Sequence, residues 1–152
     1  MLQLETEVRS AGRVQLSAPP RPYLYRPRPR ASCFSFKDTP MWQSAMTVAE
    51  KVFAATDRLP PKEDHAFTSQ IRRSALRISS DIAEACGRNR ALDKAQYHYI
   101  ARGAVTETRN HLEYGRRVGY LDAETVGQLS ALLSSLYEDL TARAGSVWKG
   151  PA

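Results

Sequence analysis

The amino-acid sequence predicts an all-α fold, an antiparallel four-helix bundle that is preceded by a disordered, Pro/Arg-rich N-terminal tail. Apolar residues recur at helical spacing in four successive segments after residue 38, and short intervals separate these segments. Five prolines lie between Ser17 and Ser32, where they remove backbone donors and favour extended conformations. We therefore divide the chain into a basic tail (1–33), a bundle (34–145) and a short C-terminal tail (146–152).

The first two helices are expected on either side of a proline-containing turn. The first begins with Thr39 as a capping hydroxyl and Pro40 at the first helical position, and it ends near residues 59–61. Its predicted core face consists of Trp42, Ala45, Met46, Ala49, Val52 and Phe53. The second helix is expected over residues 67–87, with an apolar stripe of Ile71, Ala75, Ile78, Ile82 and Cys86.

The third and fourth helices are expected on either side of a second turn. The third begins near Asn89, has Asp93 in its first turns and stops at Gly119; its apolar face comprises Tyr97, Ile100, Ala101, Ala104, Val105, Thr108, Leu112 and Gly115. Asp122 is the predicted cap of the fourth, whose apolar positions are Val126, Leu129, Leu132, Leu133, Leu136, Tyr137 and Leu140. The face of the third helix is wider than one seam requires, so we expect a second packing surface between identical subunits.

The distribution of charge and apolar residues favours a cytoplasmic protein that does not enter a membrane. The formal charge is +6, but residues 1–40 hold seven Lys and Arg against three acidic residues, whereas residues 41–152 hold fifteen against thirteen. The basic excess is therefore concentrated before the bundle and is weak evidence that the bundle binds nucleic acid. No apolar run approaches the length of a membrane span.

The sequence contains no recognisable catalytic or metal-binding pattern, and we expect neither an enzyme nor a cofactor. A di-metal site in a helical bundle requires Glu-x-x-His pairs, which are absent; Glu107 and His111 supply at most two ligands on one helix. The two cysteines, Cys33 and Cys86, form no metal-binding motif. No serine lies in a nucleophile-elbow context, and there is no glycine-rich phosphate loop.

Several motifs follow one another in the order found in a known family. These are FKD from Phe36, MWQSAM from Met41, FTSQIRRSALRISSDIAEACGR from Phe67, IARGAVTE from Ile100 and RRVGYLD from Arg116. From about Ser35 to about Arg143 the chain resembles the four-helix-bundle family encoded in intervening sequences of bacterial 23S ribosomal RNA genes. It departs from the usual family residues at Ser79, Asp81, Ala85 and Arg90, where proline, asparagine, glycine and a capping serine are common.

The resemblance implies a ring of five subunits without established enzymatic activity. A similar bundle serves diversity-generating retroelements as an accessory protein that is associated with nucleic acid and a reverse transcriptase. The expected partners are therefore further copies of the chain, RNA or DNA, and a reverse transcriptase. The alternative is a protein-interaction scaffold that does not bind nucleic acid.

Arginines on the second and third helices are the candidate nucleic-acid contacts. Arg73, Arg77 and Arg88 align on the second helix, next to Arg72, and Arg102, Arg109 and Arg116 recur at heptad spacing on the third. The alternative is an ordinary solvated face. Under that interpretation Asp81 neutralises Arg77, Glu113 neutralises Arg109 or Arg117, and Glu84 forms a structural ion pair with Arg88 or with an arginine of a neighbouring helix.

Overall fold

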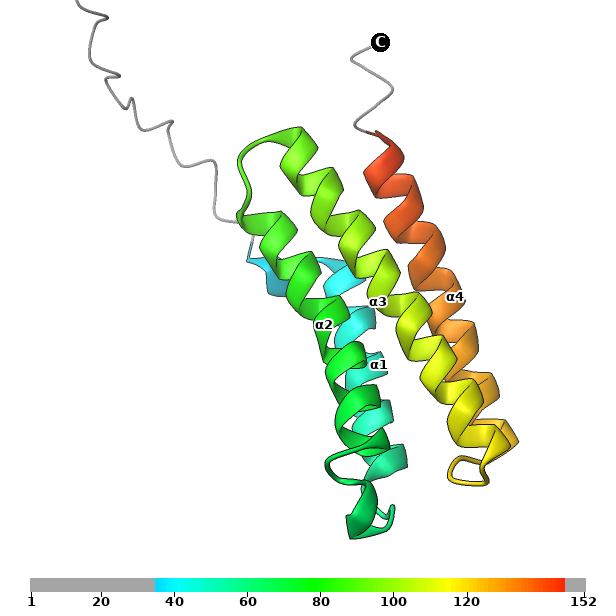
Figure 1. Ribbon diagram of the computed structural model, residues 1–152. Helices are drawn as coiled ribbons and strands as arrows, with labels where there is room; N and C mark the ends of the chain where they lie inside the picture. Colours follow the sequence, from blue (N-terminus) through cyan, green and yellow to red (C-terminus); the bar gives the residue numbers. More distant parts are fainter. Residues whose placement is uncertain (1–34, 147–152) are drawn as a thin grey trace, which may run out of the picture. The chain divides into compact units, whose positions relative to one another are not determined.

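The computed structural model describes residues 35–146, and these residues form four antiparallel α-helices without a β-strand (Figure 1). The helices are α1 (Pro40–Thr56), α2 (Phe67–Gly87), α3 (Ala91–Arg117) and α4 (Ala123–Gly145), with short 3-10 helices η1 (Phe36–Asp38) and η2 (Pro61–Glu63). Each helix packs against its two neighbours in the order α1, α2, α3, α4, and α4 returns to α1. The predicted all-α bundle is confirmed, whereas the predicted N-terminal tail (1–33) and residues 147–152 of the predicted C-terminal tail (146–152) lie outside the described residues.

The first helix ends earlier than the sequence suggested. Pro40 occupies its first turn as predicted, but Thr39 makes no side-chain capping hydrogen bond, and the helix stops at Thr56 instead of near residues 59–61. Pro60 and Pro61 have no N–H to donate to the carbonyls four residues earlier, those of Thr56 and Asp57. Before these prolines, the N–H groups of Asp57 and Leu59 donate to carbonyls only three residues earlier, those of Ala54 and Thr56, at 3.4 Å each, so the α-helical pattern gives way to a tighter turn after Thr56.

The turn between α3 and α4 is fixed by two local signals that the sequence contains. Gly119 adopts a positive φ of 79°, and the N–H of Tyr120 donates to the carbonyl of Gly115 at 2.8 Å, a glycine-terminated helix end. Asp122 then caps α4 as predicted, because its Oδ1 accepts from the N–H of Thr125 at 2.7 Å. The third helix begins at Ala91 rather than near Asn89, and Arg90 at its N-cap gives no side-chain hydrogen bond.

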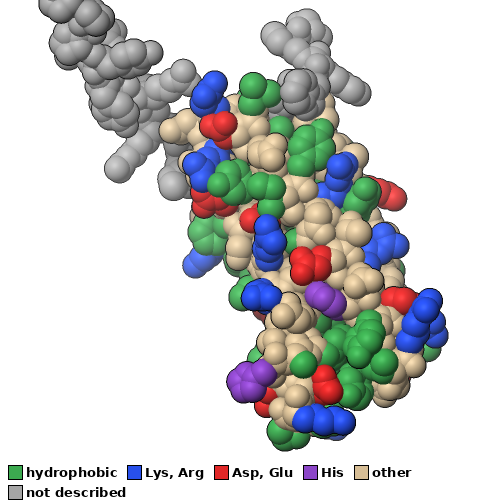
Figure 2. Space-filling view, viewed as in Figure 1, with side chains coloured by type: hydrophobic (Ala, Val, Ile, Leu, Met, Phe, Trp, Pro, Cys, Tyr) green, Lys and Arg blue, Asp and Glu red, His purple; other side chains and the backbone are tan. Residues whose placement is uncertain are grey.

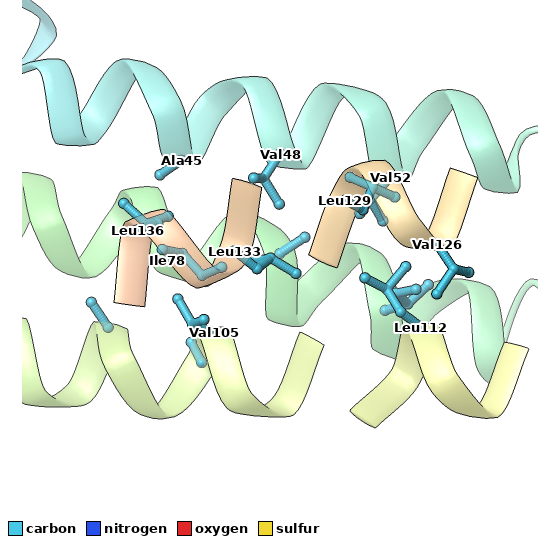
Figure 3. Close-up of a cluster of buried hydrophobic side chains, with 14 of the residues drawn as sticks. Ala45, Val48, Val52, Ile78, Val105, Leu112, Val126, Leu129, Leu133 and Leu136 are labelled. Carbon is cyan, nitrogen blue, oxygen red and sulfur yellow. The ribbon is translucent and has the colours of Figure 1, made fainter. Parts of the chain in front are cut away.

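The core runs along the centre of the bundle and is built from aliphatic side chains of all four helices (Figure 3). Val52 of α1 lies beside Leu129 of α4 in this view, and Ala45 of α1 lies near Leu136 of α4. Other large aliphatic side chains that are fully buried are Val48, Leu133, Leu140, Ile71, Ile78, Ile82, Val105 and Leu112. Because burying one such side chain contributes about 1.5–3 kcal/mol, this cluster supplies the main stabilisation of the fold.

Two predicted core residues are exposed. Phe53 keeps 54% of its surface accessible, and Cys86 is exposed, while Val48, Thr56 and Ala85 are buried in their helices. Successive helical residues are rotated by about 100°, so the neighbour of a buried residue can face solvent. The buried face of α1 is rotated slightly from the predicted stripe, whereas on α2 the predicted Ile71, Ala75, Ile78 and Ile82 are all buried and only the last position differs.

Gly115 allows the side chains of Phe67 and Leu121 to pack directly against the backbone of α3. A Cβ atom at this position would lie 2.7 Å from Cζ of Phe67 and 2.8 Å from Cδ1 of Leu121, both buried side chains. By contrast, a Cβ at Gly127, an exposed position in α4, would meet no atom within 4 Å. The two glycines therefore differ in packing while sharing a helical conformation.

We predict that Gly115→Ala lowers the free energy of unfolding by about 1–2 kcal/mol, because the overpacking cost exceeds the gain in helix propensity. The matched Gly127→Ala should raise it by up to about 1 kcal/mol, because only propensity changes there. Urea unfolding followed by circular dichroism measures both. Equal stabilisation of the two variants would show that Phe67 and Leu121 yield freely.

His98 is buried in α3 near positive charge. Its Nδ1 finds no hydrogen-bond partner within residues 35–146. Burial lowers the pKa of His98, and the nearby cations Arg143 and Lys94 lower it further. The folded protein therefore holds this imidazole neutral at pH values where an unfolded chain binds a proton.

We predict that the stability of the protein falls as the pH drops below about 6.5, because the unfolded state then binds more protons than the folded state. His98→Leu should flatten this part of the profile, whereas the exposed His65→Gln should leave it unchanged. Thermal unfolding between pH 8 and 5 compares the three proteins. A wild-type profile identical to that of His98→Leu would contradict the assignment.

Candidate functional site

Arg73 and Arg77 lie on the outer face of α2, where both side chains are exposed. Nη2 of Arg73 donates to Oε1 of Gln70 at 2.6 Å, and Nε of Arg77 lies 3.5 Å from Oδ2 of Asp81. Asp81 is partly buried, and desolvation raises its pKa despite the opposing charge of Arg77. Both arginines therefore contact residues of their own helix and join no other element.

Arg72 holds α1 against α2. Its Nε donates to Oγ1 of Thr56 at 2.8 Å, and its Nη2 donates to the carbonyl of Phe53 at 3.3 Å. The guanidinium also lies 4.1 Å from the centre of the Phe53 ring and pairs with Asp57 at 3.8 Å. These contacts satisfy the end of α1, so Arg72 has a structural task that its place beside Arg73 in the sequence does not reveal.

Arg88 joins the end of α2 to α3. Its Nη2 forms an ion pair with Glu84, one turn earlier, and donates to the hydroxyl of Tyr97 at 2.6 Å. The guanidinium lies 4.6 Å from the centre of the Tyr97 ring. Of the two predicted alternatives, Glu84 has the intrahelical partner, Arg88, and Arg88 is directed toward α3 rather than toward Arg73 and Arg77.

The three heptad-spaced arginines of α3 have different surroundings. Arg102 faces α4, where its Nη1 donates to Oγ1 of Thr141 at 3.3 Å. Arg116 makes two hydrogen bonds of 2.9 Å to Glu113. Arg109 is exposed and has no hydrogen bond or ion pair within residues 35–146.

Glu113 does not pair with Arg109, contrary to one of the predicted alternatives. It accepts hydrogen bonds from Arg116 and from Nε of Arg117 at 2.7 Å. These bonds lower the pKa of Glu113 to about 2. The last turn of α3 favours cations because carbonyl groups are exposed there, so two arginines gather around one carboxylate at this end.

The arginines of the two helices do not merge into one basic surface. Arg102 lies on the α4 side of α3, while Arg88 points into the joint between α2 and α3. Figure 2 shows basic side chains spread over the visible face with acidic ones among them. The described residues therefore present a few separate positive groups interspersed with acidic ones on this face (Figure 2).

A polar cluster between α2 and α3 was missed by the sequence analysis. Oγ of buried Ser74 lies 3.2 Å from Nδ1 of His111 and 3.1 Å from Oγ1 of Thr108. Ser74 also donates to the carbonyl of Ile71, and Thr108 to that of Ala104. Ser74 lies within the motif that begins at Phe67, but nothing in that motif indicates a partner on α3, so only the packing of the helices reveals that Ser74 bridges them.

The surrounding residues do not complete a hydrolytic site around Ser74. Within residues 35–146 no carboxylate forms a hydrogen bond with His111, so the imidazole lacks the orienting acid of a catalytic triad. Glu107, one turn before His111, is exposed. The cluster satisfies buried hydroxyls and fixes the register of α2 against α3.

The described part of the chain gathers no three His, Cys, Asp or Glu side chains in a geometry that could hold a metal ion. Each helix between residues 35 and 146 is too short or too polar to cross a lipid bilayer.

Comparison with known proteins assigns most of the bundle to one family. The model of the family described as 23S rRNA-intervening sequence protein matches residues 37–142. This match spans the four helices up to residue 142 and includes all of the candidate arginines. No curated protein matches the chain.

We predict that Arg72→Ala lowers the free energy of unfolding by about 1–3 kcal/mol, because it removes charge-assisted hydrogen bonds and leaves the buried Thr56 hydroxyl without this donor. The adjacent Arg73→Ala should change it by less than about 0.5 kcal/mol, because the one side-chain hydrogen bond of Arg73 within residues 35–146 goes to Gln70 of its own helix. Urea unfolding of both variants tests the assignment. Equal destabilisation of the two variants would contradict the division into structural and outward-facing arginines.

Proposed function

Because the chain belongs to the 23S rRNA-intervening sequence protein family, we propose that it is an oligomeric accessory protein of the cytoplasm that binds RNA or DNA and catalyses no reaction. The observation that carries this proposal is the presence of three exposed arginines that make no hydrogen bond or ion pair to another helix within residues 35–146. Arg73 and Arg77 occupy the outer face of α2, and Arg109 has no partner within residues 35–146. Arginine suits phosphate because its planar guanidinium donates two parallel hydrogen bonds.

Oligomerisation would multiply these few contacts. Two or three phosphate contacts per subunit give weak attraction, whereas a ring presents the same contacts repeatedly to one strand. Exposed Leu92 and Tyr114 and half-buried Ile100 leave apolar surface on α3 that a second copy can cover. The resemblance to the family favours five subunits.

The alternative function, a scaffold for a partner protein such as a reverse transcriptase, has its own structural support. A groove of about 310 Å³ lies between α1 and α2 and is lined by Met46, Ala49, Glu50, Phe53, Arg72 and Leu76. Phe53 and Leu76 leave 54% and 53% of their surfaces exposed. Such a groove suits an apolar side chain of a binding partner.

We predict that replacing Arg73, Arg77 and Arg109 together with glutamine weakens binding to all RNA and DNA sequences alike. On duplex DNA the slope of log affinity against log salt should fall by about 0.9 for each phosphate that is no longer neutralised, or roughly two per engaged subunit if each subunit neutralises two phosphates. A variant with Lys51, Arg58 and Arg90 changed to glutamine removes the same charge from other exposed positions and should bind more nearly as wild type does. Fluorescence anisotropy measures affinity, and light scattering gives the number of subunits.

The basic N-terminal segment requires its own control, because it can supply salt-dependent attraction without the bundle. A chain that begins at Ser32 removes most of that positive charge. We expect it to retain binding at low salt. Loss of all binding in the shortened chain, or a monomer at micromolar concentration, would contradict the proposal and favour the scaffold.

A further inference from the structure

A second groove, between α3 and α4, combines aromatic and charged groups. It has a volume of about 660 Å³, within the usual range for small-ligand sites. Tyr99, Arg102 and Gly103 of α3 line one side, and Tyr137 of α4 lines the other. Since a Cβ at Gly103 would meet no atom within 4 Å, the backbone itself forms part of the open wall.

Arg102 lies near both aromatic rings of this groove. The carbon at the centre of its guanidinium is 4.9 Å from the centre of the Tyr99 ring and 5.4 Å from that of Tyr137. Its one hydrogen bond within residues 35–146 goes to Thr141, and no carboxylate there lies within 4 Å. Most of its N–H donors therefore remain available beside two flat apolar surfaces.

The rest of the groove is lined by polar residues of α3. Asn110 and Thr106 lie one turn apart on the same side of the helix, with Glu107 beside them. An asparagine amide pairs with base edges, and a carboxylate accepts hydrogen bonds from exocyclic amino groups. Glu107 disfavours phosphate at its end of the groove, so the phosphate of a bound nucleotide would lie toward Arg102.

We propose that the groove between α3 and α4 binds an unpaired base of single-stranded RNA or DNA, stacked on the Tyr99, Arg102 and Tyr137 group, with its phosphate at Arg102. The inference rests on the proposed binding of nucleic acid and specifies single strands for this site. Base faces are covered in a duplex, whereas unpaired bases stack on aromatic rings and on guanidinium planes. Arg102 thus serves a base-stacking site rather than a phosphate stripe shared with Arg109 and Arg116.

Gly103→Met offers a test because it fills the groove without removing any of its side chains. The substitution also favours the helix, since glycine has low helix propensity. Gly127→Met is the matched control, because Gly127 is likewise an exposed helical glycine with open space at its Cβ and does not line the groove. Anisotropy with labelled 20-nucleotide oligo(U), oligo(dT) and a duplex of equal length, on the full chain, compares the proteins. Circular dichroism confirms that both variants fold.

We expect Gly103→Met to bind the single strands about tenfold more weakly, which corresponds to the stacking of one base on an aromatic side chain, and the duplex as tightly as wild type. Gly127→Met should match wild type with all three probes. Tyr137→Phe should retain single-strand affinity and Tyr137→Leu should reduce it, because only phenylalanine keeps the ring.

Two outcomes would overturn the inference, and they differ in what else they affect. If wild type binds but Gly103→Met matches it on single strands, or weakens single-strand and duplex binding equally, the groove does not hold a base, while the proposed function stands. If wild type binds neither single strands nor duplex at low salt, the proposed function fails together with the inference.

Discussion

The structure depends on the burial of one continuous aliphatic seam shared by four helices. Leu129, Leu133, Leu136 and Leu140 recur along α4 at spacings of three and four residues and meet α1, α2 and α3 at the centre of the bundle. None of these helices could bury its apolar face alone. Their common core therefore fixes which side of each helix remains available for polar groups and for function.

Once that seam is buried, the arginines divide according to their distance from the joints between helices. Those beside a neighbouring helix, such as Arg72 and Arg88, donate to its carbonyls or hydroxyls and lie against its aromatic rings. Those on outer faces, such as Arg73 and Arg109, are left for solvent or a ligand. Arginine therefore has two roles in this chain, and the packing of the helices determines which role each arginine has.

Polar contacts fix the alignment of α2 along α3, which the apolar core alone does not determine. Leucine and isoleucine side chains tolerate small shifts along the bundle axis, but Ser74, Thr108 and His111 meet only in one alignment of α2 with α3. Gly115 adds a steric constraint one turn after His111 on α3, where Phe67 and Leu121 leave no room for a methyl group. Together these contacts select one arrangement among several that would bury similar apolar area.

The sequence by itself determined the all-α class, the four helices, the Asp122 cap and the Gly119 stop, because periodicity and capping act within one helix or turn. It also placed Glu84 one turn from Arg88, since i and i+4 neighbours are fixed by helical geometry. It could not place Phe53 and Cys86 outside the core, because a rotation of one residue step depends on which neighbour a helix meets. Only the tertiary structure decided that Arg102 faces Tyr137, thirty-five residues later, while Arg88 faces Tyr97 of α3. Contacts between helices depend on rotation, register and crossing of whole elements, and no local pattern encodes these.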